Sequence, residues 1–292
     1  MSGAPDQLFN VHNNFYLGAF QASINEAGDC FGLSDTETTE RDCFVYRSYI
    51  AMGSYELVIS EISEDAPTAL QSVKLLATYL SDETQKETVV ATLNEWLADP
   101  VCANNATLLL MAATVFAHEG NLNEALKCCH AGSSHLELLA MSIQLMLKMD
   151  RADCAEKQLK AMTAIDDDAT CTQLATAWGN LALGGSKIQE AFYVFQELGD
   201  KYSWTVRLHN GSAVCSMHMG RYDEAEKELL EALNKDGKDA DTLANLSVCF
   251  FHLNKPVTRF INQLKVVAPE HVMLKRQSSY EEAFDRAAQG YE

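Results

Sequence analysis

Two cysteines and the histidines around them are the residues of this chain whose types could do chemistry at close spacing. Cys128-Cys129-His130 lies between His118 and His135. Thiolates and imidazoles bind zinc where paired spacings such as C-x2-C and H-x3-H let four side chains converge on one ion. Those spacings are absent here, and Cys129 falls on the apolar stripe of a helical pattern. We therefore interpret both cysteines as core residues and predict no metal site and no cofactor.

Three further groups resemble functional motifs only in part. Gly184-Gly185-Ser186-Lys187 lacks the spacing of a phosphate loop and lies between two helical patterns, so we predict a turn. Asp166-Asp167-Asp168 precedes a helical pattern that begins near Ala169, and we expect it to cap that helix. No H-E-x-x-H or G-x-S-x-G motif occurs. We predict that the protein is not an enzyme, with a thiol enzyme using Cys128 or Cys129 left as an alternative.

The stretch Gly220–Leu233 indicates which elements position these residues. Gly220 allows a tight turn, Tyr222 follows it, and Ala225, Leu229 and Ala232 continue one face at helical spacing. Glycine, aromatic, alanine, bulky residue and alanine at these offsets are typical of the second half of a tetratricopeptide repeat. Each such repeat is a pair of antiparallel helices.

The small residue of this pattern recurs along the chain. We place it at Ser23, Val58, Thr88, Ala125, Ala155, Ala191 and Ala225. The steps run from 30 to 37 residues, with a mean of about 34, which is the tetratricopeptide period. The pattern predicts an all-α fold, an α-solenoid of tetratricopeptide-like helix pairs that form a superhelix. We expect one domain over 1–292, with regular repeats over about 6–239.

The pattern weakens at several places. A polar segment with glycines, Gly28–Thr39, predicts an enlarged loop, and Pro67 suits the first position of a helix. Beyond Asp239, Pro256 interrupts the helix that should complete a pair, and Ser279–Gln289 reads as a final helix. We expect the atypical helices of 240–292 to cap the solenoid, because a terminal repeat has no neighbour to cover it.

Composition narrows the function classes. The 292 residues carry a formal net charge of −19, which opposes binding to nucleic acid or to anionic lipid heads. The first residues contain no apolar run typical of a signal peptide, and no stretch approaches 18 apolar residues. We therefore expect a cytoplasmic protein with reduced cysteines and no membrane insertion.

Five stretches are longer and more specific than the repeat consensus requires. They are D-Q-L-F-N-V-H-N-N-F-Y-L-G-A-F (6–20), R-D-C-F-V-Y-R-S-Y-I-A (41–51), L-L-L-M-A-A-T-V-F-A-H-E-G-N (108–121), L-K-M-D-R-A-D-C-A-E-K-Q-L-K-A-M (147–162) and D-D-D-A-T-C-T-Q-L-A-T-A-W-G-N-L-A-L-G-G (166–185). In order and extent, they resemble the epsilon subunits of coatomer, the COPI coat of Golgi-derived transport vesicles. The resemblance covers essentially the whole chain.

The resemblance implies a non-enzymatic, structural coat subunit. Members of that family bind and stabilise the C-terminal domain of the alpha subunit, as a heterodimer within the larger coat, and support Golgi-to-ER and intra-Golgi transport. They reach Golgi membranes and COPI-coated vesicles peripherally, through the complex, which a small GTPase recruits. The same role would follow for this chain.

A tetratricopeptide array offers the faces of its first helices as a groove for an extended partner segment. In our register the groove positions are Arg47, Gln144, Asn180, Asn210, Val214 and His218. We expect these to contact the alpha subunit, with acidic neighbours attracting a basic segment. The alternative is a generic tetratricopeptide adaptor of chaperone or membrane-fusion machinery. A chaperone adaptor would clamp a carboxylate with convergent Lys, Arg and Asn side chains.

Overall fold

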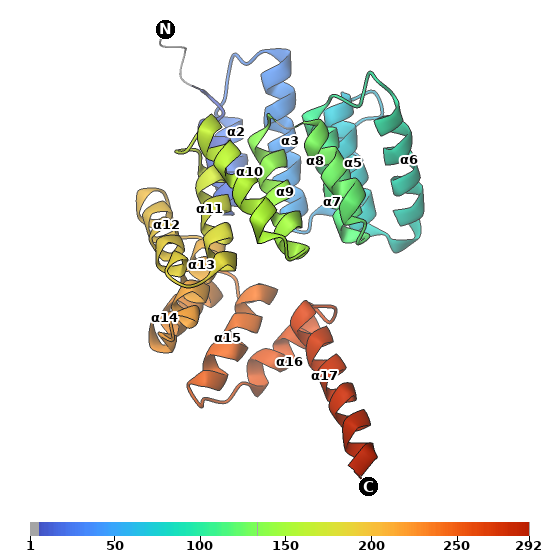
Figure 1. Ribbon diagram of the computed structural model, residues 1–292. Helices are drawn as coiled ribbons and strands as arrows, with labels where there is room; N and C mark the ends of the chain where they lie inside the picture. Colours follow the sequence, from blue (N-terminus) through green and yellow to red (C-terminus); the bar gives the residue numbers. More distant parts are fainter. Residues whose placement is uncertain (1–5, 133, 292) are drawn as a thin grey trace. The chain divides into compact units, whose positions relative to one another are not determined.

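The computed structural model describes residues 6–132 and 134–291, and within them it contains α-helices, short 3-10 turns and no strand (Figure 1). The helices group into two compact units, with the boundary between Leu183 and Gly184. We call these the N-terminal unit and the C-terminal unit and describe each by itself. The all-α fold of helix pairs predicted from the sequence is confirmed. The expectation of one domain over 1–292 stays a prediction.

The N-terminal unit consists of helix pairs. Its first helices are α1 (Phe9–Leu17), α3 (Asp35–Ala51), α5 (Thr68–Ser81), α7 (Ala106–His118), α9 (Leu136–Lys148) and α11 (Thr170–Leu183). Its second helices are α2 (Phe20–Gly28), α4 (Tyr55–Glu61), α6 (Lys86–Ala98), α8 (Leu122–Ala131) and α10 (Ala152–Ile165), with a 3-10 turn η1 (Glu83–Gln85) before α6. The first helices α1 to α9 each pack against their second helix, and α11 packs against α9 and α10.

The first helices of this unit form a closed ring of contacts. Each of them contacts the next from α1 to α11, and α11 contacts α1 in turn. Two helices that lie about 150 residues apart in the sequence therefore lie side by side. This closure was not predicted, because nothing in a repeat's local pattern specifies where the array meets its own beginning.

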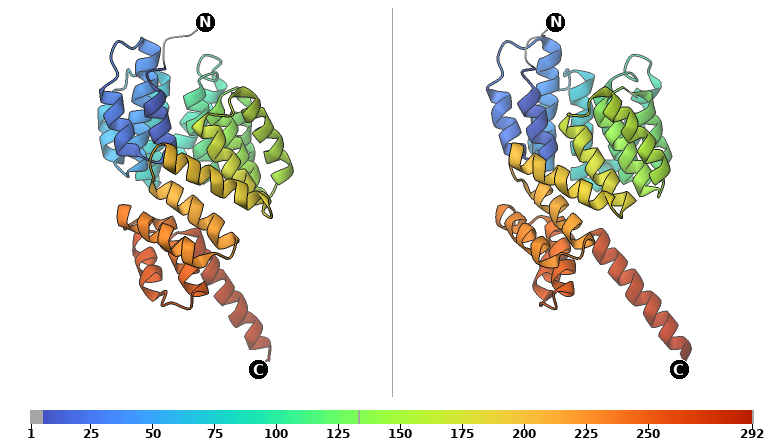
Figure 2. Two further views of the ribbon diagram at one scale, coloured as in Figure 1. Left: turned by 90° about the vertical axis from the view of Figure 1, so that its left-hand side faces the viewer. Right: turned by 60° about the vertical axis from the view of Figure 1, so that its left-hand side comes forward.

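The C-terminal unit contains α12 (Lys187–Lys201), α13 (Val206–His218), α14 (Tyr222–Lys235), α15 (Ala240–His252), α16 (Thr258–Val267), α17 (Val272–Ala288) and a 3-10 turn η2 (Gln289–Tyr291). Consecutive helices from α12 to α16 pack on one another, and α13 also contacts α15. Its α17 is the atypical terminal helix. Figure 2 shows α17 directed away from α15 and α16 in both views.

Small residues allow these helices to approach closely. Ala225, Ala191 and Ala125 are completely buried, as the repeat pattern predicts. Gly211 on α13 is a stronger case, because a Cβ atom there would lie 2.6 Å from the ring of Phe195 on α12. The predicted small position Thr88 is wrong, because Thr88 is exposed and Val89 takes the buried place one residue later.

Four predicted helix boundaries are corrected by local structure. The loop expected over Gly28–Thr39 is only 29–34, because Ser34 and Glu37 form a capping box that starts α3 at Asp35. Pro67 is the N-cap of α5 and not its first residue. Although Pro256 delays it, α16 still forms from Thr258.

The final helix, the fourth case, begins at Val272, seven residues before the predicted start. The cause lies at His271, whose side chain accepts a hydrogen bond from the backbone N–H of Met273 and caps α17. The same side chain lies 3.1 Å from Asp241 on α15, so the start of α17 is anchored to α15. Met273 and Leu274 then pack against the apolar core of the C-terminal unit.

Candidate functional site

A residue with positive φ follows most first helices, so it marks equivalent positions in successive repeats. These corner residues are Gly18, Gly53, Gly120, Asp150, Gly184, Gly220 and Asn254. We call the residues six positions before each corner the inner row: His12, Arg47, Thr114, Gln144 and Trp178 in the N-terminal unit, and Val214 and Val248 in the C-terminal unit. Arg47, Gln144 and Val214 from the predicted groove belong to this row.

Arg47 on α3 is engaged inside the N-terminal unit. Its guanidinium donates to both carboxylate oxygens of Glu137 on α9, with Nη2–Oε1 at 2.6 Å and Nη1–Oε2 at 3.1 Å. It also lies over the ring of Phe15 on α1 at 4.6 Å and over that of Phe44 at 4.7 Å. The exposed fractions of the Arg47 and Glu137 side chains are 11% and 25%. The open groove expected around Arg47 is thus closed by the unit's own side chains.

Arg47 stays protonated although its side chain is buried. Burial alone would lower the pKa of Arg47, but the Glu137 carboxylate and its hydrogen bonds more than compensate, so the pKa is raised. A bidentate arginine–carboxylate pair that is also stacked on aromatic rings fixes the orientation of the guanidinium. The pair therefore joins α3 to α9 across the ring of first helices.

A second polar contact closes the ring between α1 and α11. The Thr170 hydroxyl donates to Asn13 Oδ1 at 2.6 Å, and both side chains are buried. Next to Asn13, His12 packs on the ring of Phe44 at 4.3 Å and lies 3.4 Å from Glu40. The atom nearest to Glu40 is Nε2, whose geometry toward Glu40 Oε1 does not make a hydrogen bond. Burial lowers the pKa of His12, and Glu40 opposes this only in part.

The two other groove residues predicted in this unit differ in their exposure to solvent. Gln144 lies on the inner row of α9 and is exposed. Asn180 on α11 is buried, with 7% of its surface exposed. Gln144 is therefore accessible to a partner in this structure, whereas Asn180 is a packing residue.

In the C-terminal unit, the predicted residues all lie on α13. Asn210 is buried and donates to the Thr242 hydroxyl at 2.7 Å, and its own Oδ1 accepts from Asn245 on α15 at 2.9 Å. It thus ties α13 to α15. Val214 is half-buried and His218 is exposed, so these two remain accessible.

Sequence reasoning missed the exposed apolar side chains of the C-terminal unit. Val248 and Phe251 on α15 are 41% and 71% exposed, and Tyr280 and Phe284 on α17 are 70% and 73% exposed. Val248 belongs to the inner row, and Phe251 lies one turn after it. The available signal was Phe250-Phe251, since only the first of two adjacent aromatics can lie on the core stripe of a helix. We call these four side chains, which come from two helices that point apart, the exposed apolar residues of the C-terminal unit.

The cysteines singled out by their spacing are buried. Cys128 and Cys129 lie on α8, and burial raises the pKa of the first thiol to about 11 and of the second to about 12. A thiol with so high a pKa stays protonated near neutral pH and is a poor nucleophile. The described residues contain no cluster of three or more side chains suited to a metal ion.

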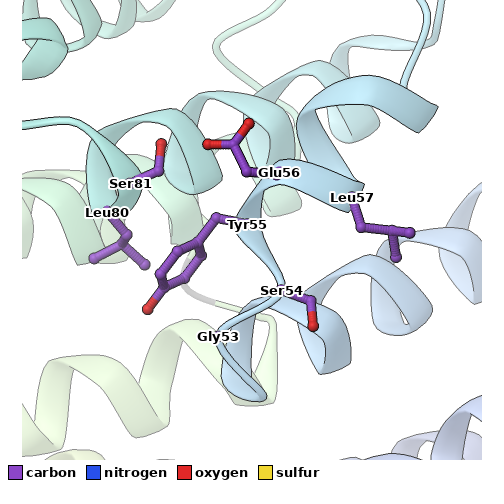
Figure 3. Close-up of a pocket in the computed structure, with 7 residues that line it drawn as sticks. All are labelled: Gly53, Ser54, Tyr55, Glu56, Leu57, Leu80 and Ser81. Carbon is purple, nitrogen blue, oxygen red and sulfur yellow. The ribbon is translucent and has the colours of Figure 1, made fainter.

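A shallow hollow of about 450 Å³ lies at the corner between α3 and α4, beside the end of α5 (Figure 3). It is lined by Gly53, Ser54, Tyr55, Glu56, Leu57, Leu80 and Ser81. Figure 3 shows the Glu56 carboxylate directed away from the Tyr55 hydroxyl, so the polar groups do not converge. A site for a small molecule needs converging polar groups and enclosure, and the hollow has neither.

Two predicted local structures are confirmed. Gly184 and Gly185 both have positive φ and form the turn before α12. Asp166 Oδ1 accepts hydrogen bonds from the backbone N–H groups of Asp168 and Ala169, just before α11 begins at Thr170. Over the part of the chain that is described, none of the helices has both the length and the apolar composition required to span a membrane.

Known structures share the fold. A tetratricopeptide repeat protein from Parabacteroides merdae superposes with a TM-score of 0.61 at 13% identity, covering 88% of this chain and 96% of that chain. A chain of the APC/C hetero-tetramer Cut9–Hcn1 also gives a TM-score of 0.61 at 15% identity, covering 90% of this chain and 53% of that chain. At such identities the likeness concerns the fold alone.

Sequence comparison is more specific. Coatomer subunit epsilon-1 of Arabidopsis thaliana is 56% identical over 98% of this chain and 98% of its own length. Coatomer subunit epsilon of Dictyostelium discoideum is 40% identical over 91% of this chain and 92% of its own length. The sequence model of the coatomer epsilon subunit matches residues 4–292. The chain therefore belongs to the coatomer epsilon subunit family, and it is a component of the COPI coat.

Proposed function

We propose that this coat component binds and stabilises the C-terminal domain of the coatomer alpha subunit, and in doing so supports Golgi-to-ER and intra-Golgi transport. Membership of the family supports a structural role in the coat. The fold of helix pairs supports recognition of another polypeptide, since such arrays commonly offer extended surfaces to partners. Attachment to Golgi membranes would then occur through the assembled coat.

The observation that carries the proposal is the set of exposed apolar residues of the C-terminal unit. Four large apolar side chains on α15 and α17 are exposed on a chain with a net charge of −19. Exposed aromatic side chains such as these are candidates for burial by a partner. Burial of aromatic side chains by a partner would supply much of the affinity, because interface hot spots are rich in them.

Gln144, Val214 and His218 are the predicted groove residues that are accessible without any rearrangement. We keep them as proposed contacts of the alpha subunit. The strongly acidic charge of the chain would accelerate association with a basic partner segment, and this effect would weaken as salt is added.

A clamp for a carboxylate, as in chaperone adaptors, receives less support. Such a clamp needs an arginine that is free to bind an incoming carboxylate, and Arg47 already binds Glu137 in two places. The proposed binding to the alpha subunit does not need Arg47 to be free. It therefore fits the structure better than the adaptor alternative.

Co-expression with the C-terminal domain of a coatomer alpha subunit tests the proposal. We expect a stable complex of one chain with one domain, with its mass measured by light scattering. Two separate peaks of folded protein would contradict the proposal.

A variant series then tests the surface. Replacing Phe251, Tyr280 and Phe284 by alanine should weaken the complex by at least about tenfold, since each lost aromatic anchor can cost more than 1 kcal/mol. Tyr193→Ala is the matched control, because Tyr193 is 61% exposed but lies on a different helix, α12. Equal affinity of the triple variant and the control would exclude this surface.

A further inference from the structure

The last helix of the C-terminal unit is exposed over most of its length. Met273 and Leu274 near its start pack against the apolar core of the unit, whereas every residue of α17 from Lys275 onward is exposed. Figure 2 shows this part directed away from α15 and α16. Helical segments shorter than about 15 residues are only marginally stable in water without packing partners. The exposed part of α17 is therefore suited to pairing with another helix.

The side chains along one side of this segment follow the spacing of a coiled coil. Gln277, Tyr280, Phe284 and Ala287 are separated by steps of three, four and three residues. Such alternating steps are typical of the seam between two paired helices. Tyr280 and Phe284 on this seam are 70% and 73% exposed. We call these four residues the α17 seam.

The charge of α17 differs from that of the chain as a whole. The chain carries a net charge of −19, whereas α17 itself is neutral. Its basic and acidic residues are equal in number: Lys275, Arg276 and Arg286 against Glu281, Glu282 and Asp285. Two copies of a strongly acidic chain repel each other least where they are locally neutral. A basic partner, by contrast, would gain little electrostatic attraction from α17.

The positions of two charges specify how two copies would pair. Arg276 comes just before the seam residue Gln277, and Glu281 comes just after the seam residue Tyr280. In a parallel pair, residues at these two flanking positions of opposite helices lie beside each other. Parallel pairing therefore places Arg276 of each copy beside Glu281 of the other. In an antiparallel pair Arg276 would face only uncharged residues of its own flank, so the parallel arrangement alone is complementary in charge.

We propose that α17 pairs in parallel with α17 of a second copy of this chain, with the α17 seam between them. The Tyr280 and Phe284 rings of the two copies form successive layers of the interface. The Arg276–Glu281 contacts fix the register, and the polar Gln277 on the seam adds to this specificity at a cost in stability. So short a seam buries little area, so the dimer is weak, with a dissociation constant in the micromolar range or above.

Self-pairing and the proposed function compete for the same side chains. Tyr280 and Phe284 are also proposed contacts of the alpha subunit, so a bound alpha subunit excludes the second copy. Self-pairing then belongs to the chain before it joins the coat, where it removes exposed aromatic side chains from water. The pairing does not rest on the proposed function, whereas the competition does.

Sedimentation velocity of the free full-length chain, over a wide range of concentrations, tests the pairing. We expect a reversible shift from monomer to dimer as the concentration rises. Phe284→Ala should weaken the dimer by at least about tenfold, because it removes an aromatic side chain from both copies. Tyr193→Ala is the matched control, since Tyr193 is 61% exposed but lies on α12. A monomer at every concentration, or equal effects of the two variants, would overturn the proposal.

Charge reversal tests the parallel register. Arg276→Glu alone and Glu281→Arg alone each turn two attractive contacts per dimer into repulsive ones, so each should weaken the dimer by about tenfold. Mixing the two single variants should restore the wild-type affinity, because every contact in the mixed dimer again joins opposite charges. Glu282→Arg is the control, since it makes the same change of charge on the side of α17 away from the seam. A mixture as weak as its components would overturn the parallel pairing.

Addition of the C-terminal domain of the coatomer alpha subunit tests the competition. We expect the dimer to be replaced by a complex of one chain with one domain. A complex that holds two copies of the chain would overturn the competition. Absence of alpha-subunit binding would overturn the proposed function and the competition together, whereas the sedimentation series decides self-pairing independently.

Discussion

The two units use equivalent positions of the same repeat differently. In the N-terminal unit the ring of first helices closes, and Arg47 of the inner row meets Glu137 of the same unit, while Gln144 of that row stays exposed. In the C-terminal unit Val248 of the inner row and its neighbour Phe251 are exposed. The comparison shows that a repeat position does not by itself specify a binding residue. What decides its use is whether a distant residue of the same unit, such as Glu137 for Arg47, reaches that side chain.

The largest expected effect tests whether the inner row of the N-terminal unit is structural. Glu137→Ala would leave the buried Arg47 cation without its partner, which typically destabilises a protein by about 3–5 kcal/mol. Urea unfolding, with hydrogen exchange of α3 and α9 as the regional probe, measures the loss.

The matched control for Glu137 lies in the C-terminal unit. Glu226→Ala breaks an ion pair with Lys255, whose side chain is 42% exposed, and should cost less than about 1 kcal/mol. Similar losses for the two variants would remove the contrast between a closed and an open unit.

The next largest loss of stability is expected where α12 and α13 pack closely in the C-terminal unit. Gly211→Ala would place a Cβ atom 2.6 Å from the Phe195 ring, so we expect a loss of about 1–3 kcal/mol in thermal or urea unfolding. Gly179→Ala is the control in the N-terminal unit, because its Cβ would meet only Leu159, at 3.5 Å. It should be neutral or stabilising, as alanine favours helices over glycine. A stable Gly211→Ala protein would show that α12 and α13 are less tightly packed than described.

The stability of the N-terminal unit should depend on pH through His12. Burial lowers the pKa of His12 below its ordinary 6.5, so the unfolded chain binds more protons than the folded one just below that pH. Its contribution is present above pH 6.5 and is lost as the pH falls through the folded pKa. We expect the N-terminal unit to lose stability as the pH falls below 6.5.

Replacement of His12 provides the check on this assignment. His12→Gln should reduce the pH dependence of urea unfolding. Part of that dependence should remain, because burial also lowers the pKa of His118 on α7. An identical dependence in wild type and variant would exclude His12 as a contributor.

The smallest effect on stability concerns the exposed apolar residues of the C-terminal unit. Phe251→Ala should change the free energy of unfolding by no more than about 0.5 kcal/mol, because Phe251 is already 71% exposed. Phe44→Ala is the contrasting variant, since Phe44 is 4% exposed and its loss should cost about 3–5 kcal/mol. A large destabilisation by Phe251→Ala in thermal unfolding would indicate a structural role for Phe251 and weaken its assignment to a partner.

The local features of the fold could be predicted well, because they depend on neighbouring residues. The corner at Gly220, the buried Ala225 and the Asp166 cap before α11 all involve contacts within a few residues. The failures had local causes too. The Ser34–Glu37 capping box and the His271 cap were overlooked, so the starts of α3 and α17 were placed too late.

The candidate site was predicted less well, because accessibility depends on distant residues. Arg47 and Asn210 were assigned to an open groove on periodicity alone. Their partners Glu137 and Thr242 lie 90 and 32 residues further along the chain, so no local pattern indicates that these side chains are already bound. The binding roles of the six predicted residues stay predictions, of which Gln144, Val214 and His218 need no rearrangement.

The amino-acid sequence by itself determined the helix pairs, their period and the family, because turns, small residues and apolar stripes act over a single repeat. Only the tertiary structure decided which inner-row side chains are engaged within their own unit. For Arg47 the partner is Glu137, 90 residues further along the chain, and the ring of first helices closes where Asn13 meets Thr170 across 157 residues. Such a contact arises from small rotations accumulated over many repeats, and no single repeat encodes their sum.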